Sequence, residues 1–132
     1  EKKEDEYWDL KGMKILIAED NALNMEIASF ILEELKATIT CVQNGKQALD
    51  MSKKEKFDVI LMDIMMPEMD GYMATQKIRE FDKETPIIAV TANAFVEDVK
   101  KCKAAGMNDH ISKPLNTEKV LETVLKYKKE KR

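Results

Sequence analysis

Short hydrophobic runs alternate along the chain with segments in which hydrophobic residues recur at helical spacing. Residues 14–18 form an apolar run that ends in two acids, which is typical of a buried strand, and residues 58–63 repeat this pattern. Residues 38–42 are rich in β-branched side chains, which also favours a strand. The pattern predicts five strands, at residues 14–18, 38–42, 58–63, 86–91 and 110–113.

The intervening segments predict five helices. Leu23, Ile27, Phe30 and Ile31 recur at helical spacing after Asn21, which is a suitable N-cap. Residues 46–54 predict a second helix, and the Asn44-Gly45 pair before it is a turn signal. The other three helices are expected from the hydrophobic residues Ala74, Ile78 and Phe81, then Phe95, Val99 and Cys102 with Gly106 as the C-cap, then Val120, Leu121, Val124 and Leu125.

Strands that alternate with helices predict an α/β fold in which a parallel sheet is covered on both faces. Right-handed crossovers make this a doubly wound (βα)5 sandwich with five parallel strands. Ligands of such sheets bind at the carboxyl ends of the strands, near the switch in strand order. The residues that end each strand are therefore the first candidates for a functional site.

Composition narrows the class of protein. The chain has 132 residues, 44% of them hydrophobic, which suits one compact domain with its own core. The 22 basic and 25 acidic residues nearly balance, which argues against direct binding to nucleic acid. No apolar run has the length of a membrane span or signal peptide, so we expect a cytoplasmic location without direct membrane contact. Cys41 and Cys102 are too few for a disulfide scaffold.

The two ends of the chain differ from its middle. Residues 1–12 begin with charged side chains and predict a linker or tail, residues 13–127 predict the domain, and residues 128–132 predict a basic tail. The charged first residues do not include a methionine at position 1. We therefore expect a domain taken from a longer protein.

Reactive side chains gather where the predicted strands end. Glu19 and Asp20 follow the first strand, Asp63 ends the third, Thr91 ends the fourth and Lys113 ends the fifth. Neighbouring carboxylates repel one another unless a cation intervenes, and hard oxygen ligands suit Mg²⁺. A metal, a second cation and a hydroxyl are the groups that phosphoryl transfer needs, and a carboxylate can be its nucleophile. The pattern predicts magnesium-assisted phosphorylation of an aspartate.

Four sequence motifs stand at the ends of the predicted strands. They are Ile-Ala-Glu-Asp-Asn at 17–21, Leu-Met-Asp-Ile-Met-Met-Pro-Glu-Met-Asp-Gly at 61–71, Ala-Val-Thr-Ala at 89–92 and Ser-Lys-Pro at 112–114. In this order and spacing, the motifs resemble the receiver domain of two-component response regulators, over residues 13–127. The resemblance implies the flavodoxin-like receiver topology and a signalling switch that catalyses its own phosphorylation and dephosphorylation, rather than a turnover enzyme.

The resemblance assigns roles at the metal and the phosphoacceptor. It implies that Asp63 accepts a phosphoryl group from a phosphohistidine on a histidine kinase or a histidine phosphotransfer domain. It also implies that Glu19, Asp20 and Asp63 bind Mg²⁺ together with the main-chain carbonyl of Met65. The cofactor expected for this chain is therefore Mg²⁺.

Further residues are assigned to the phosphate and to the switch. The resemblance implies that Lys113, the Thr91 hydroxyl and the Ala92 N–H contact the phosphoryl oxygens. His110 occupies a position where the family often has Tyr or Phe, so a switch role with Thr91 is expected for it. Met65 and Asn93 lie two residues beyond Asp63 and Thr91, where the family tunes the rate of dephosphorylation.

Details of the sequence favour one kind of receiver. Residues 19–24, 93–94 and 106–110 are similar to receivers at the C-terminus of hybrid sensor histidine kinases, so the parent protein is expected to be such a kinase, with this domain in its cytoplasmic part. A stand-alone single-domain response regulator is the alternative, and a pseudo-receiver that only binds partners is a weaker one. A weak homodimer is also compatible with the sequence.

Two other functions fit the same fold class. An aspartyl-phosphate phosphatase typically has a second acid two residues after the nucleophile, but that position is Met65. A flavodoxin-like electron carrier needs a hydroxyl-rich phosphate loop after the first strand, but Glu19 and Asp20 would repel a flavin phosphate there. The phosphorylatable receiver is the hypothesis that uses all the residues at the strand ends.

Overall fold

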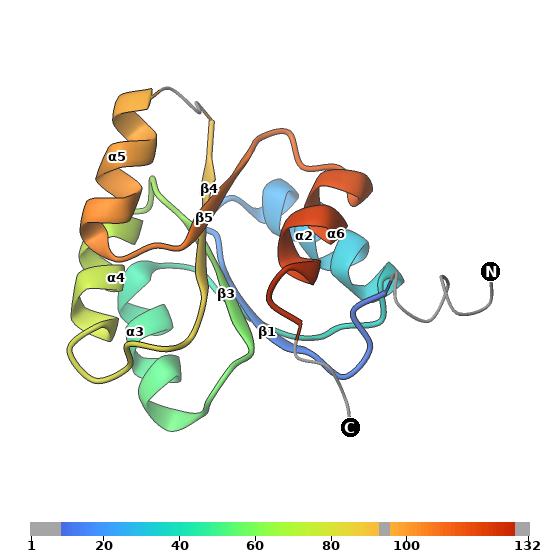
Figure 1. Ribbon diagram of the computed structural model, residues 1–132, viewed down its shortest axis with the longest axis horizontal. Helices are drawn as coiled ribbons and strands as arrows, with labels where there is room; N and C mark the ends of the chain where they lie inside the picture. Colours follow the sequence, from blue (N-terminus) through green and yellow to red (C-terminus); the bar gives the residue numbers. More distant parts are fainter. Residues whose placement is uncertain (1–8, 93–95, 129–132) are drawn as a thin grey trace.

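The computed structural model describes residues 9–92 and 96–128 and contains five strands and five helices in these ranges (Figure 1). The helices are short, and none in these ranges is long and apolar enough to cross a membrane. In chain order the elements are β1 (Lys14–Ala18), α2 (Ala22–Glu34), β2 (Thr38–Val42), α3 (Gly45–Lys54), β3 (Val59–Asp63), α4 (Gly71–Ile78), β4 (Ile87–Thr91), α5 (Val96–Ala105), β5 (Asp109–Ser112) and α6 (Thr117–Leu125).

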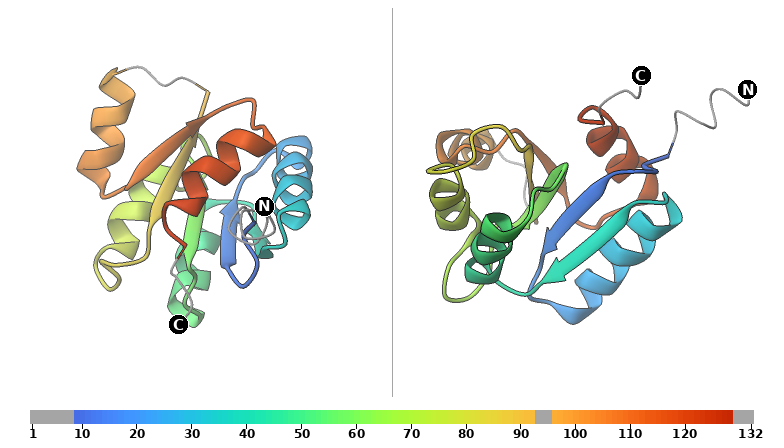
Figure 2. Two further views of the ribbon diagram at one scale, coloured as in Figure 1. Left: turned by 45° about the vertical axis from the view of Figure 1, so that its right-hand side comes forward. Right: turned by 90° about the horizontal axis from the view of Figure 1, so that it is seen from below.

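The five strands form one parallel sheet in the order β2-β1-β3-β4-β5. Helices α2 and α6 cover one face of the sheet, and α3, α4 and α5 cover the other (Figures 1 and 2). The connections leave β1 and β3 toward opposite faces, so the switch in strand order lies between these two central strands. The predicted doubly wound (βα)5 sandwich is confirmed, and its ligand edge is where β1 and β3 end.

Side-chain caps begin four of the helices. Asn21, Asn44, Asp70 and Asn116 each accept a hydrogen bond from the main-chain N–H three residues further on. The Asn44-Gly45 pair is therefore a helix start and not a turn, because an Asn that ends an extended segment can cap the next helix equally well. Gly106 has a φ of 107° after α5, as expected for its C-cap.

The sheet separates two hydrophobic layers. Alternate residues of each strand point to opposite faces, so Leu16 and Ile60 pack toward α3, α4 and α5. Their neighbours Ile17 and Leu61 pack toward α2 and α6. Strands β3 and β4 are buried along their whole length. Because both faces of the central strands are covered, the polar groups at their carboxyl ends are held on a rigid base.

The helix predicted after Asn21 is confirmed as α2, but only part of its hydrophobic surface is buried. Leu23, Ile27 and Phe30 have exposed fractions of 64%, 40% and 65%. Ile31 recurs at the same helical spacing and is buried. Periodicity marks a hydrophobic stripe, but this helix carries two stripes and the sheet covers one of them. The buried stripe consists of Ala28, Ile31 and Leu32.

The segment before β1 is attached to the domain. Leu10 is fully buried in the layer beneath α2 and α6, and its N–H donates to the carbonyl of Leu35 at 2.7 Å. The Nζ of Lys128 donates to the main-chain oxygen of Asp9 at 3.0 Å and lies 3.4 Å from its carboxylate. Residues 9 and 10, which were expected to belong to a linker or tail, thus pack with the domain.

Candidate functional site

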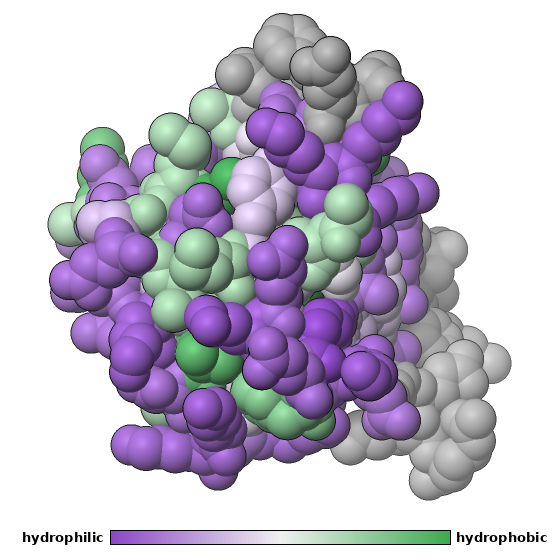
Figure 3. All heavy atoms as spheres, turned by 90° about the vertical axis from the view of Figure 1, so that its left-hand side faces the viewer, coloured by the Kyte–Doolittle hydropathy of each residue, from purple (hydrophilic) through white to green (hydrophobic). Residues whose placement is uncertain are grey.

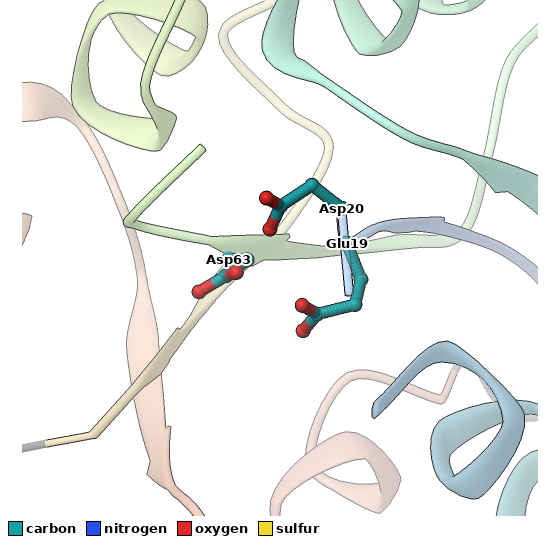
Figure 4. Close-up of side chains that lie close together, drawn as sticks. All are labelled: Glu19, Asp20 and Asp63. Atoms are coloured by element: carbon teal, nitrogen blue, oxygen red, sulfur yellow. The ribbon is translucent and has the colours of Figure 1, made fainter. Parts of the chain in front are cut away.

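Three carboxylates meet at the carboxyl edge of the two central strands. Glu19 follows β1 directly, and Asp63 is the last residue of β3. One oxygen from each of Glu19, Asp20 and Asp63 lies within 4.8 Å of the others. Figure 4 shows the three carboxylates directed toward a common space. Glu19 and Asp63 are buried, whereas Asp20 is exposed at the rim of the cluster.

Main-chain hydrogen bonds hold the two buried acids in place. The N–H of Glu19 donates to the carbonyl of Val42, which continues the ladder between β1 and β2 by one residue. The N–H of Asn21 donates to Oε2 of Glu19 at 3.2 Å. After Asp63, the N–H of Ile64 donates to the carbonyl of Val90 in the neighbouring strand. Both carboxylates therefore project from backbone that belongs to the sheet rather than from free loops.

Lys113 supplies the positive charge nearest to the cluster. Its Nζ lies 3.3 Å from Oε1 of Glu19 and 3.4 Å from Oδ1 of Asp63. The ammonium is partly buried, and the Lys113 N–H donates to the Thr91 carbonyl at 2.7 Å. The predicted meeting of acids and a lysine at one edge is confirmed for these residues.

Charge at the cluster is unbalanced. Burial and the negative charge of Glu19 raise the pKa of Asp63 and the ammonium of Lys113 lowers it, with a net pKa of about 6. One ammonium thus faces three carboxylates, and the folded protein itself leaves negative charge uncompensated. A donor set made only of carboxylate oxygens, with this excess of negative charge, fits a small hard divalent cation such as Mg²⁺.

The other predicted site residues lie at different distances from this edge. Thr91 ends β4 and is buried, one position beyond Val90, the register partner of Asp63. Ala92 follows it and is exposed, whereas Asn93 lies outside the described residues. The β3–α4 loop, residues 64–70, carries Met65, whose side chain is 77% exposed. The edge therefore gathers the acids, the lysine and the Thr91 position, with the Met65 loop beside them.

His110 is separate from the cluster. It pairs with Ala89 in the interior of β4, two residues before Ser112 comes level with Thr91. Its side chain is partly exposed and lines a cavity of about 260 Å³ together with Cys102 and Asn108. Its switch role stays a prediction.

A small cavity shows residues that the sequence interpretation did not include in the site. The cavity, of about 40 Å³, is lined by the charged residues Glu19 and Lys113 and also by the hydrophobic residues Ile27 and Leu115. Ile27 belongs to the exposed stripe of α2, so this stripe reaches the acidic cluster. A signal was present in the sequence, because residues 23–32 of α2 hold more hydrophobic residues than one buried face needs.

Comparison with known proteins identifies the family. The family model of the response regulator receiver domain matches residues 15–125, which include most of β1, the acidic cluster and all of α6. The chain belongs to the response regulator receiver domain family. The match agrees with the resemblance of the four motifs and with the observed fold, and it favours the receiver over the phosphatase and the electron carrier.

Among curated relatives, this receiver domain is similar to parts of histidine kinases. It is 37% identical to the "Probable histidine kinase 1" of Oryza sativa subsp. indica, over 86% of this chain and 15% of that protein. It is 36% identical to the "Signal transduction histidine-protein kinase BarA" of Escherichia coli, over 89% of this chain and 13% of that protein. The chain thus spans less than a sixth of the length of these two relatives.

Solved structures share the fold of the receiver domain. The receiver domain of a sensor histidine kinase from Pseudomonas aeruginosa has a TM-score of 0.83 and 37% identity, covering 88% of this chain and 97% of that one, and its crystal structure holds a magnesium ion in the active site cleft. The receiver domain of Ssk1 from Saccharomyces cerevisiae, solved with the histidine phosphotransfer protein Ypd1, has a TM-score of 0.85 and 27% identity, covering 90% of each chain.

Proposed function

We propose that Asp63 is the phosphoacceptor of this receiver domain. A carboxylate oxygen of Asp63 attacks the phosphorus of a phosphohistidine, a P–O bond forms, the P–N bond breaks, and the leaving imidazole takes up a proton. The observation that carries the proposal is the buried Asp63 carboxylate, next to Glu19 and in contact with the ammonium of Lys113. Hydrolysis of the acyl phosphate by water then returns the carboxylate.

The residues at the edge divide the work of holding the phosphoryl group. Lys113 already lies 3.4 Å from Asp63, so its charge offsets the negative charge brought by the phosphoryl oxygens. The Thr91 hydroxyl and the Ala92 N–H are proposed as donors to the same oxygens from the end of β4. Because Lys113 already contacts Asp63, its ammonium needs little reorganisation before the transfer.

The metal is proposed to be Mg²⁺. Glu19, Asp20 and Asp63 would hold it with the main-chain carbonyl of Met65. When bound, Mg²⁺ supplies charge neutralisation for the carboxylates and for the phosphoryl oxygens. The magnesium ion in the cleft of the Pseudomonas aeruginosa receiver supports this choice.

The switch and its tuning are proposed from positions next to the phosphoacceptor. Phosphorylation is proposed to draw Thr91 toward Asp63 and to shift the face from β4 to α6 between two arrangements. His110 would sense this shift from β5, and Met65 and Asn93 would tune how fast water removes the phosphoryl group. The proposed tuning role of Met65 is supported by its 77% exposure in the loop beside the acidic cluster.

The phosphodonor is proposed to dock on the exposed stripe of α2, which consists of Leu23, Ile27 and Phe30. The stripe is hydrophobic, and the cavity lined by Ile27, Glu19 and Lys113 connects it with the acidic cluster. On the face of α3, α4 and α5, hydrophobic side chains are scattered among hydrophilic ones (Figure 3). We propose a histidine phosphotransfer protein or a histidine kinase as the donor, supported by the Ypd1 complex of the Ssk1 receiver.

We propose that the parent protein is a hybrid histidine kinase, since two of the curated relatives carry that name. A cytoplasmic location follows from the need to meet the phosphodonor. The domain boundaries, a weak homodimer and the single-domain alternative stay predictions.

Acetyl phosphate tests the phosphoacceptor directly. Incubation with acetyl phosphate and Mg²⁺ is expected to add one phosphoryl mass in intact-protein mass spectrometry, and none without Mg²⁺. Asp63→Asn should abolish the gain, whereas Asp50→Asn, which removes an exposed acid of α3, should preserve it. A gain that survives in the Asp63 variant would refute the assignment, and labelling that ignores magnesium would refute the metal site.

A second experiment tests the docking surface. Ile27→Lys is expected to slow transfer from a purified phosphohistidine donor at least about tenfold, because it puts a charge into a hydrophobic contact. Labelling by acetyl phosphate should stay unchanged, since this small donor needs no docking surface. Phe81→Lys is the matched control, as Phe81 is 46% exposed beyond α4. Equal loss of transfer in both variants, or none in the α2 variant, contradicts the proposed surface.

A further inference from the structure

The β3–α4 loop is enclosed by two glycines that come from different helices. Gly71 begins α4, and a Cβ added to it would lie under 3.0 Å from the carbonyl oxygen of Asp63. Gly45 begins α3, far from the loop in sequence, and a Cβ added to it would lie under 3.0 Å from the carbonyl oxygen of Met69. Real Cβ atoms essentially never approach other atoms so closely, so the backbone of the loop fits only beside glycine.

Conformation does not explain the glycine at position 45. Positive φ values occur among the described glycines at Gly12 and Gly106 and not at Gly45, which lies in an ordinary helical turn. At a helical position alanine is favoured over glycine by up to about 1 kcal/mol. The close approach of the Met69 carbonyl is thus the constraint that the structure gives for Gly45.

The β3–α4 loop is short and its ends are hydrogen-bonded to each other, so a displacement of Met69 is expected to displace the loop residues next to Asp63 as well. The N–H of Gly71 donates to the carbonyl of Ile64 at 2.9 Å, which ties the two ends of the loop together. The N–H of Met69 donates to the carbonyl of Pro67 at 2.7 Å. Between these bonds lies Met65, whose carbonyl is the proposed fourth protein ligand of the metal. A displaced Met69 therefore moves this carbonyl relative to Asp63.

We infer that Gly45 is a positioning residue for the metal site, acting through the Met69 carbonyl on the loop that carries Met65. This inference rests on the magnesium site proposed above. Mg²⁺ demands near-ideal octahedral geometry at short distances, whereas Ca²⁺ accepts longer and more irregular contacts. A loop shifted by a fraction of an ångström should thus weaken Mg²⁺ binding more than Ca²⁺ binding.

Gly45→Ala tests this inference in the full chain by calorimetric titration with Mg²⁺ and with Ca²⁺. The dissociation constant for Mg²⁺ is expected to rise roughly tenfold, as for other residues that support metal ligands, with a smaller rise for Ca²⁺. Gly106→Ala is the control, because its Cβ would strain φ and press on Arg79 at the opposite edge of the sheet. It should destabilise the fold and leave both dissociation constants unchanged.

The outcomes separate the possible failures. If the unchanged protein binds no Mg²⁺, the proposed metal site fails; if it binds Mg²⁺ and folded Gly45→Ala binds equally well, only the positioning role fails. If Mg²⁺ binding is weakened equally in Gly45→Ala and Gly106→Ala, the effect comes from a general loss of stability, and the inference is overturned. Ala74→Gly added to Gly45→Ala should not restore binding, because restoration would assign the glycine to packing against the Cβ of Ala74.

A measurement on the unchanged protein keeps the inference testable if Gly45→Ala does not fold. Addition of Mg²⁺ should shift the amide resonances of Gly45 and Met69 in two-dimensional NMR spectra, while that of Gly106 stays in place. If Mg²⁺ shifts only the amide resonances of residues that follow β1 and β3 and leaves that of Gly45 in place, the inferred link between Gly45 and the metal site is contradicted.

Discussion

The excess of negative charge around Asp63 predicts that removing this carboxylate stabilises the metal-free protein. Asp63 is only 3% exposed, and burial together with the charge of Glu19 raises its pKa from 3.8 to about 6. Because the Asp63 carboxylate binds a proton more tightly in the folded than in the unfolded state, the contribution of Asp63 to stability is most favourable below about pH 4 and falls as the pH rises through about 6. Asp63→Asn abolishes this fall.

The size of the effect follows from the shift. A difference of one in pKa between the folded and unfolded states corresponds to about 1.4 kcal/mol. The rise of the Asp63 pKa from 3.8 to about 6 therefore predicts that Asp63→Asn raises the free energy of unfolding by about 3 kcal/mol near pH 7.5. The gain should vanish near pH 3, where the carboxyl is protonated in both states. Mg²⁺ should narrow the difference, since it stabilises only the protein that retains the carboxylate.

Urea unfolding in the presence of EDTA, followed by circular dichroism at several pH values, measures this difference. Asp50→Asn is the control, because within residues 9–92 and 96–128 its exposed carboxylate pairs only with Lys46 and should change stability by no more than about 0.5 kcal/mol. The reasoning is refuted if Asp63→Asn is no more stable than the unchanged protein near pH 7.5, or if its advantage persists at pH values near 3.

Two further predictions concern stability away from the site. Leu10→Ala should lower the free energy of unfolding by roughly 2–4 kcal/mol in urea because it empties a fully buried position, whereas Leu23→Ala on the exposed stripe should change it by less than about 0.5 kcal/mol. Burial alone would raise the pKa of Asp82, but hydrogen bonds from the Thr85 hydroxyl and nearby main-chain N–H groups lower it to about 2. Asp82→Asn should therefore cost about 2 kcal/mol near pH 7, with the loss fading as the pH falls from 4 toward 2; a loss independent of pH would contradict this cause.

The acidic cluster could be predicted from the sequence because its geometry follows from topology. Residues that directly follow parallel strands must meet at one edge, so Glu19, Asp63 and Lys113 come together whatever the details of the helices. The order of apolar runs and helical segments was sufficient for the sheet and its two covered faces, because each central strand is hydrophobic on both sides.

What could not be predicted depends on contacts between distant segments. The hydrophobic residues of α2 do not reveal which of two stripes meets the sheet, so the sequence does not distinguish the exposed Leu23 and Phe30 from the buried Ile31. Leu10 is hidden among charged neighbours in the sequence, although it inserts under Leu35. The sequence also does not reveal why residue 45 is a glycine, because the Met69 carbonyl that approaches it lies in the loop after β3.

The bond between Lys128 and Asp9 has a consequence for how this domain can be carried within a larger protein. The two residues flank the domain, and Asp9 precedes β1, at the edge of the sheet opposite to Asp63. Chain arriving before Asp9 and chain continuing after Lys128 thus share one point of attachment, and the edge where strands end faces away from it. In a larger protein, this bond would hold the two points of attachment together and leave the edge with Asp63 on the far side, open to a partner.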